Sequence, residues 1–210
     1  MNFLLLRGGC MTGYQHFVNI FGSGLFIRSE KIKKRYSFEK ALSSLYIIPS
    51  FYKGLYYIPT ERERKGHFIE HKQDFFIALF NQQYGRGNWY WALSTAARYY
   101  GFEWSATGIL EVMTKKRSKR IDISHRIESL KQKKSYRSVT LADYYESLQV
   151  NVIYVHKGDK SNVSSIRIDG EIGPVCTKDQ LLSDLSTYVS KVKEERLKRI
   201  YKRIMNEIEG

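Results

Sequence analysis

Apolar residues in the first third of the chain recur at spacings of three and four, which predicts short helices. Residues 12–22 place Phe17, Ile20 and Phe21 on one side behind Thr12, a residue suited to cap a helix. Residues 24–36 place Ser29 before a second short helix that has Ile32 as its apolar contact. The chain therefore opens with small helices, each with one buried side.

The next apolar pattern joins a helix to a hairpin. Ser37 precedes residues 38–45, whose apolar positions predict a helix capped by that serine. Two β-prone runs, 46–48 and 55–58, flank a loop that turns at Gly54. A helix pair followed by such a hairpin, or wing, predicts an amino-terminal winged helix-turn-helix.

Residues 60–66 are charged and contain no apolar side chain, so we expect the domain boundary there, dividing the chain into 1–65 and 66–210. Beyond it, helical patterns cover 67–83 and 89–100, the second ending at Gly101. The aromatic residues between 89 and 104 lie among small residues, which favours a core over a base-stacking surface.

The remaining pattern predicts a small mixed sheet and further helices, so the fold class is α/β (α+β). Strands are expected at 109–114, 121–124 and 150–156, with 163–168 as the partner of the last and a turn at Asp169-Gly170. Residues 126–138 are polar and basic, and are expected to be loop with some helix, and 141–148 a helical turn or two. Thr177 caps a helix that begins at Lys178, and residues 193–209 continue as a long charged carboxy-terminal helix.

Charge makes a polyanion the favoured partner. The 210 residues carry a net charge of +14, with 42% hydrophobic residues, so the chain is globular and strongly basic. The two cysteines, Cys10 and Cys176, make no disulfide framework, and no apolar run is long enough for a membrane span. The apolar run at residues 3–6 is too short for a signal peptide, and Met11 is an alternative start. We expect a cytoplasmic protein.

The first domain gathers the residues that we expect to contact DNA. Basic side chains at helix ends and on a wing meet phosphates, and polar side chains of the second helix meet base edges. The expected DNA-binding residues are Arg28, Lys31, Lys33, Lys34, Arg35, Ser37, Lys40, Ser43, Ser44 and Lys53. An ordinary solvated basic face is the alternative.

Three other groups of residues are candidates for a binding, metal or catalytic site. The run Lys115 to Arg120 is densely basic, which suits an exposed loop, a nucleic-acid backbone or an acidic protein partner. His67 and His71 stand four apart, as zinc ligands do, but no third ligand is apparent, so no metal is expected. His156 and Asp159 can act as base and acid, although no catalytic motif accompanies them and no cofactor is implied.

Two segments carry a family resemblance. The hairpin strand 53–59 and the segment 90–101 (Tyr-Trp-Ala-Leu-Ser-Thr-Ala-Ala-Arg-Tyr-Tyr-Gly) resemble the AbiEi family of antitoxins. Later strands and the segment 173–185 follow a similar order, so the likeness covers roughly residues 25 to 190. The wing here, with Pro49-Ser50-Phe51-Tyr52, is less basic than is usual in that family.

This resemblance implies a DNA-binding autorepressor of its own operon, with residues 37–45 as the reading helix and Lys53 as the basic residue of the wing. It also implies a second domain that counters a nucleotidyltransferase-like toxin. We therefore expect a transcriptional autorepressor and antitoxin without catalysis, whose partners are promoter DNA and such a toxin. The alternatives are a nucleic-acid-processing enzyme, either a restriction nuclease or a DNA glycosylase, and a protein-interaction module.

Overall fold

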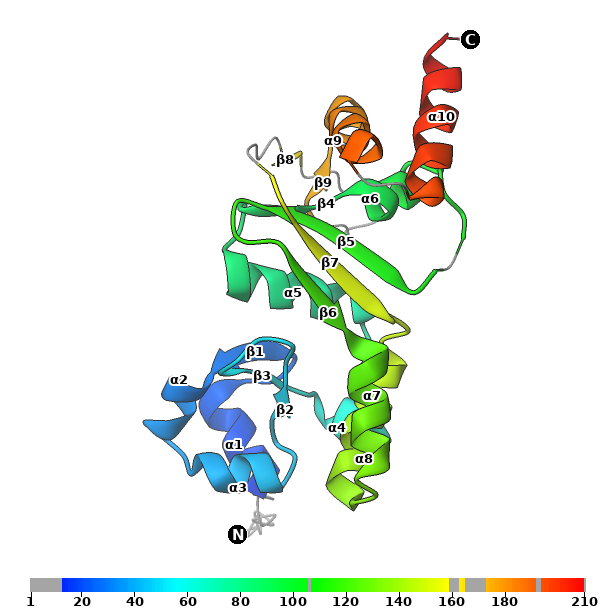
Figure 1. Cartoon of the computed structure of the whole chain (residues 1–210). Coiled ribbons are helices and arrows are strands. Elements are labelled where there is room, and N and C mark those ends of the chain that lie inside the picture. The colour runs from blue at the N-terminus through cyan, green and yellow to red at the C-terminus, as the bar shows by residue number, and fades with distance from the viewer. Residues whose placement is uncertain (1–12, 106, 159–162, 165–172, 192–193, 210) are drawn as a thin grey trace, which may run out of the picture. The chain divides into compact units, whose positions relative to one another are not determined.

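The computed structural model describes residues 13–105, 107–158, 163–164, 173–191 and 194–209 (Figure 1). The chain divides into two compact units, Met1–Gly66 and His67–Gly210. This division lies one residue beyond the expected boundary. Both helices and strands are present, so the protein belongs to the mixed α/β class.

The described part of the first unit, residues 13–66, contains four helices and a three-stranded sheet. Its elements are α1 (Gly13–Phe21), β1 (Leu25–Arg28), α2 (Ser29–Lys33), α3 (Phe38–Ser43), β2 (Ile48–Pro49), β3 (Leu55–Ile58) and α4 (Glu61–Gly66). The sheet is antiparallel with the order β1-β3-β2. Helices α1, α2 and α3 pack through one core, in which Phe17, Ile32 and Ala41 are fully buried.

Helix α4 occupies the charged segment in which the domain boundary was expected. Thr60 Oγ1 accepts a hydrogen bond from the Glu63 backbone N–H (3.2 Å), and the Glu63 carboxylate accepts one from the Thr60 N–H (2.7 Å). This reciprocal pair is a capping box. The Tyr57 hydroxyl also donates to Glu63, so a carboxylate that is 2% exposed has its oxygens satisfied. The sequence analysis assigned no helix to this segment, because it contains no apolar side chain.

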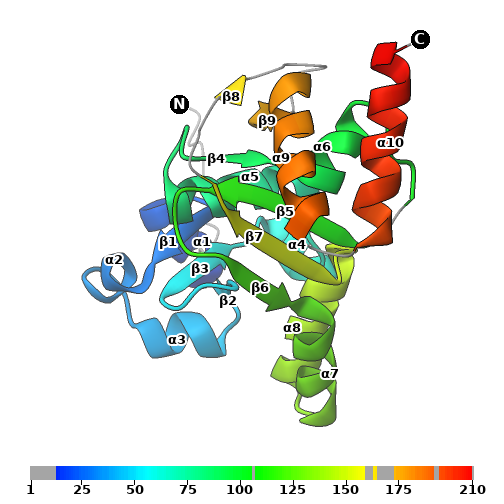
Figure 2. The ribbon, with the colours of Figure 1, turned by 45° about the horizontal axis from the view of Figure 1, so that its top comes forward.

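The second unit is built on a six-stranded sheet of order β6-β7-β5-β4-β9-β8 (Figure 2). Its strands are β4 (Trp89–Trp91), β5 (Ile109–Thr114), β6 (Lys119–Asp122), β7 (Val152–Lys157), β8 (Val163–Ser164) and β9 (Val175–Cys176). The β5–β7 and β4–β9 pairs are parallel, and the other neighbours are antiparallel. The sheet is therefore mixed, as expected.

Helices cover both faces of this sheet. Helix α5 (Lys72–Tyr84) lies on one face, and α6 (Leu93–Tyr99), α9 (Lys178–Lys191) and α10 (Glu195–Glu209) lie on the other (Figure 1). Helices α7 (Ile123–Gln132) and α8 (Tyr136–Ser147) pack on each other as a pair. Within the described residues, no helix is long and apolar enough to cross a membrane.

Several expected elements change type. Residues 89–91 form a strand and not the start of a helix, because they pair with β5 and β9 and their side chains are buried on both faces of the sheet. Trp89 and Trp91 pack on Phe80 of α5, and Tyr90 donates to Asp184 of α9. A continuous apolar run does not distinguish a buried strand from a buried helix. Helix α5 begins at Lys72 and not at residue 67, and residues 123–132 are helical after the short strand β6.

The predicted partner of the 150–156 strand was also wrong. Strand β7 pairs with β5 and β6, whereas the two described residues of the 163–168 segment, Val163 and Ser164, pair with β9. The expected turn at 169–170, the Thr12 cap, and Cys10 and Met11 lie outside the described residues. Thr177 caps α9 as predicted, since its Oγ1 accepts from the Gln180 N–H at 3.3 Å.

Candidate nucleic-acid interface

Two buried anchors determine which sides of α2 and α3 face solvent. Ile32 of α2 and Ala41 of α3 are fully buried in the core of the first unit. The Tyr36 N–H donates to the Ile32 carbonyl (2.9 Å), which ends α2, and Ser37 Oγ accepts from the Lys40 N–H (3.2 Å), which begins α3. Ser37 therefore serves as the predicted helix cap.

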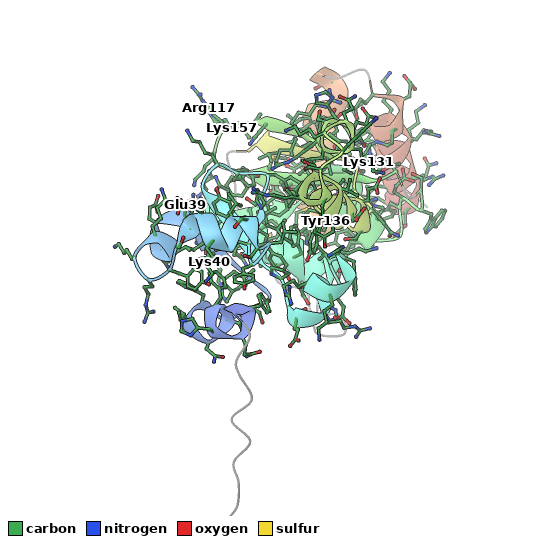
Figure 3. All side chains as sticks on the ribbon, turned by 90° about the horizontal axis from the view of Figure 1, so that it is seen from below. Glu39, Lys40, Arg117, Lys131, Tyr136 and Lys157 are labelled. Carbon is green, nitrogen blue, oxygen red and sulfur yellow. The ribbon has the colours of Figure 1, made fainter. Side chains whose placement is uncertain are left out.

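The outward side of α3 carries short polar and charged groups. Glu39, Lys40, Ser43 and Ser44 are all exposed, and Figure 3 labels Glu39 and Lys40 on this helix. Ser43 Oγ donates to the Lys40 carbonyl (3.2 Å), which occupies its proton but leaves its oxygen able to accept. This face can therefore offer both hydrogen-bond donors and acceptors to a partner.

The cations near α2 fall into two groups. Lys31, Lys34 and Arg35 line a cavity of about 350 Å³ beside α1 and β1. Lys33 instead lies with its ammonium 5.4 Å from the ring centre of Phe38, at the start of α3. All four side chains are exposed, and Lys33 lies next to the start of the expected reading helix.

The hairpin tip lies close to the start of α2. The Ser29 N–H donates to the Gly54 carbonyl (3.0 Å), and Gly54 has the positive φ of 74° that glycine adopts readily. Lys53 is exposed beside this contact. This backbone hydrogen bond therefore holds the hairpin tip, which carries Lys53, against the first turn of α2.

Arg28 lies at the junction of β1 and α2. It is the last residue of β1, paired with Leu55 of β3, and it is half-buried. It is also the N-cap residue of α2, so Ser29 is the first residue of that helix and not the predicted side-chain cap. Of the ten expected DNA-binding residues, the other nine are exposed on α2, α3, the flanking turns or the hairpin.

Positive charge is concentrated in the first unit. Residues 1–66 hold 11 lysine and arginine residues against 4 acidic ones, a net charge of +7. The whole chain carries +14, so half of the excess lies in less than a third of the residues. Such a density favours association with a polyanion.

The basic run of the second unit is partly a strand. Lys115, Lys116 and Arg117 are exposed in the turn after β5, and Figure 3 labels Arg117. Lys116 Nζ donates to the Gln83 carbonyl (3.1 Å). The last two basic residues, Lys119 and Arg120, belong to β6, where Arg120 pairs with Asp122 (2.9 Å). The predicted loop is thus limited to the residues before β6.

A buried polar cluster lies between the sheet and α10. Glu111 of β5 is 2% exposed and accepts from the Ser94 N–H (2.9 Å). Its oxygens also lie 3.3 Å from Arg196 Nη2 and 3.4 Å from His156 Nε2. The ring of His156 packs against Tyr188 with centres 4.8 Å apart. His156, which we weighed as a catalytic base, therefore faces a buried carboxylate; Asp159 lies outside the described residues.

Electrostatics keep Glu111 ionised. Burial acts to raise the pKa of Glu111, but the close His156 ring, the Arg196 guanidinium and the hydrogen bond from Ser94 outweigh it, so the pKa lies below its usual value. Asp184 of α9 behaves oppositely: burial raises its pKa despite hydrogen bonds from Gln180 and Tyr90. The contributions of these two side chains to the free energy of unfolding should therefore change with pH in opposite directions.

The two histidines considered as zinc ligands do not share a helix face. His67 has a φ of 56° and its ring lies near Tyr136 and Tyr144, whereas His71 precedes α5. Among the described residues, no three His, Cys, Asp or Glu side chains gather as metal ligands would.

Comparison with family models, curated proteins and solved structures gave no match to this chain. The resemblance to AbiEi antitoxins therefore rests on the quoted segments alone.

Sequence reasoning missed two groups that hold the elements in place. The Thr60-x-x-Glu63 capping box has a recognisable spacing, so the sequence contained its signal. The Glu111–Arg196 contact joins residues far apart in the chain, and nothing local to either residue indicates the other.

Proposed function

We propose that the protein is a sequence-specific DNA-binding repressor, with the first unit acting as a winged-helix domain. One observation supports the proposal. The first unit has the element order α1-β1-α2-α3-β2-β3 and a sheet of order β1-β3-β2, and the polar face of α3 and the lysine-bearing hairpin belong to this same unit.

In this arrangement α3 lies in the major groove, where Lys40 and the α3 serines meet base edges. Lys33 and Lys53 meet phosphates on either side of the groove. Glu39 repels phosphate and can accept from a cytosine amino group, so it restricts the sequences that fit. The Lys31, Lys34 and Arg35 group adds charge without lying on the reading face.

The operon context of the proposal comes from the AbiEi resemblance. It implies that the bound DNA is the chain's own promoter and that the second unit counters a nucleotidyltransferase-like toxin. The gene adjacent to this one, and co-purification of its product with the full chain, test that part.

DNA binding is tested by fluorescence anisotropy with a duplex from upstream of the gene and a scrambled duplex of equal length, over a range of salt concentrations. We expect the upstream duplex to bind at least tenfold more tightly, with affinity falling steeply as salt rises. Lys40→Ala should weaken upstream binding by roughly 1–3 kcal/mol and reduce the preference for that duplex.

Lys53→Ala should weaken binding to both duplexes and lower the salt dependence by about one charge. Lys133→Ala is the matched control, since Lys133 is exposed at the end of α7 in the second unit. Equal binding of the two duplexes, or an equal loss in the Lys133 variant, would refute the repressor proposal.

A further inference from the structure

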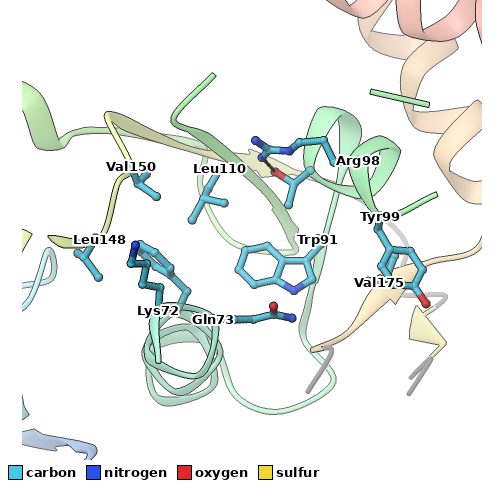
Figure 4. A pocket seen from close by; sticks show the side chains of 11 residues that line it. Lys72, Gln73, Trp91, Arg98, Tyr99, Leu110, Leu148, Val150 and Val175 are labelled. Atoms are coloured by element: carbon cyan, nitrogen blue, oxygen red, sulfur yellow. Dashed lines mark hydrogen bonds between the residues drawn. The ribbon is translucent and has the colours of Figure 1, made fainter. Parts of the chain in front are cut away.

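The second unit contains a cavity of about 420 Å³ that the proposed DNA contacts do not use. It lies between α5, α6 and the ends of sheet strands, and its walls include Phe76, Trp91, Leu110 and Val150 (Figure 4). This volume is within the range of small-molecule sites, and aromatic and aliphatic walls suit a flat apolar body.

Both charged side chains among the described residues that line this cavity are cations. They are Lys72 from the first turn of α5 and Arg98 from α6, and this described part of the lining includes no aspartate or glutamate. In Figure 4 Lys72 extends from α5 toward Val150, and Arg98 extends from α6 on the other side of Leu110. Glu111 and Glu103 act electrostatically on Arg98 from outside the lining, but both charged groups of the described lining are cations, which favours an anionic guest.

Arg98 is held in place by its own protein contacts. Its Nη2 donates to the Ile109 carbonyl (2.5 Å) and to Thr95 Oγ1 (3.3 Å). A guanidinium has five N–H donors, so others stay available for a carboxylate or phosphate. Burial lowers the pKa of Arg98, and an anion at the guanidinium would offset that loss of solvation.

A second polar group of the lining is unsatisfied. The Tyr99 hydroxyl is buried and has no hydrogen-bond partner among the described residues. A buried hydroxyl without a hydrogen-bond partner costs about 1–3 kcal/mol, so native structures seldom keep one unless a water molecule or a ligand supplies the hydrogen bond.

We propose that this cavity binds a small molecule with a planar aromatic body and one anionic group, either a carboxylate or a phosphate. The ring system lies against Trp91 and Phe76, and the anion is held by Arg98 and Lys72. The site is separate from the proposed DNA interface, so its test needs no DNA.

Calorimetric titration of the full chain tests this. The probes are 1-naphthoate and 1-naphthyl phosphate, which distinguish the two anions, with 1-naphthylmethanol and 1-naphthylmethylammonium as neutral and cationic counterparts. We expect one site per chain, with at least one anion bound about tenfold more tightly than the alcohol, and no binding of the cation. Equal affinity for the alcohol and both anions, or no anion binding up to millimolar concentration, would overturn the proposal.

Variants locate the site. Lys72→Met and Arg98→Met should each weaken binding of the preferred anion about tenfold, whereas Lys115→Met, an exposed cation outside the lining, should leave it unchanged. Val150→Phe fills the cavity and should abolish binding. If the Val150 variant does not fold, the comparison of Lys72 with Lys115 still decides, and equal affinities in those two variants would overturn the proposal.

Discussion

Glu63 and Glu111 are both 2% exposed, and each is kept buried by a different set of partners. Glu63 accepts from a backbone N–H and from the Tyr57 hydroxyl, whereas Glu111 also faces Arg196 and His156. A buried carboxylate is tolerated only when its oxygens are paired. Single substitutions at these two positions should therefore have large effects.

Glu63→Ala should lower the free energy of unfolding by about 2 kcal/mol, because it removes the capping box and the hydrogen bonds that the Tyr57 hydroxyl and the Thr60 N–H donate to the carboxylate. Urea denaturation measures the change. Glu61→Ala is the control in the same helix, since Glu61 is exposed and forms a surface ion pair with Lys65. Equal shifts of the two midpoints would contradict the capping role.

Glu111→Gln should destabilise the protein by about 3 kcal/mol at neutral pH, because Arg196 loses its buried counter-charge. The pKa of Glu111 is lowered by folding, so its contribution is complete above the usual glutamate value of 4.5 and is lost as the pH falls through the folded pKa. The difference between wild type and variant should shrink on acidification below pH 4.5.

The variant Asp184→Asn should show the opposite dependence of stability on pH. Folding raises the pKa of Asp184, so its protonated carboxyl group contributes fully to stability below the usual value of 3.8, and this contribution is lost as the pH rises through the folded pKa. The stability of Asp184→Asn relative to wild type should therefore increase from acid toward neutral pH. Urea denaturation across this range checks both variants, and parallel pH curves would refute the assignment.

At the scale of elements, apolar spacing and capping residues explain most helices. Helices α3 and α9 begin after Ser37 and Thr177 as predicted, because a cap and an apolar repeat are local features of the chain. Strand β4 was predicted to be helical, because a continuous apolar run has no periodicity that distinguishes a strand from a helix. Its pairing with β5 and β9 makes it a strand. The pairing of β8 with β9 likewise depends on distant chain segments.

Helix α10 provides an element-scale prediction. Its apolar stripe includes Ile200, which is 1% exposed, and ends at Ile208, which is 61% exposed. Ile200→Ala should destabilise the second unit by about 2–4 kcal/mol, whereas Ile208→Ala should change stability by less than about 0.5 kcal/mol. Urea denaturation and hydrogen exchange of the α10 amides measure both, and equal effects would show that α10 does not pack through this stripe.

At the scale of the molecule, two compact units carry separate cores and equal net charges of +7. The first has its core around Phe17, and the second has a six-stranded sheet with helices on both faces. Because each unit buries its own apolar residues, each is expected to fold as a unit.

Fragments 1–66 and 67–210 should each unfold cooperatively when produced separately, as scanning calorimetry can show. Glu63→Ala should move only the transition of the first fragment, and Glu111→Gln only that of the second. In the full chain the two effects should add, because the substituted residues lie in different cores. A fragment without a transition would contradict this independence.

The sequence alone determined the mixed class, the basic helix pair with its hairpin, the Ser37 and Thr177 caps, and the strands 109–114 and 150–156, because caps, turns and apolar repeats act over a few residues. Tertiary structure decided that Trp89–Trp91 is a strand, that Glu111 meets Arg196, and that Lys72 and Arg98 share a cavity. Those outcomes depend on burial and charge pairing between residues distant in sequence, which no local pattern specifies.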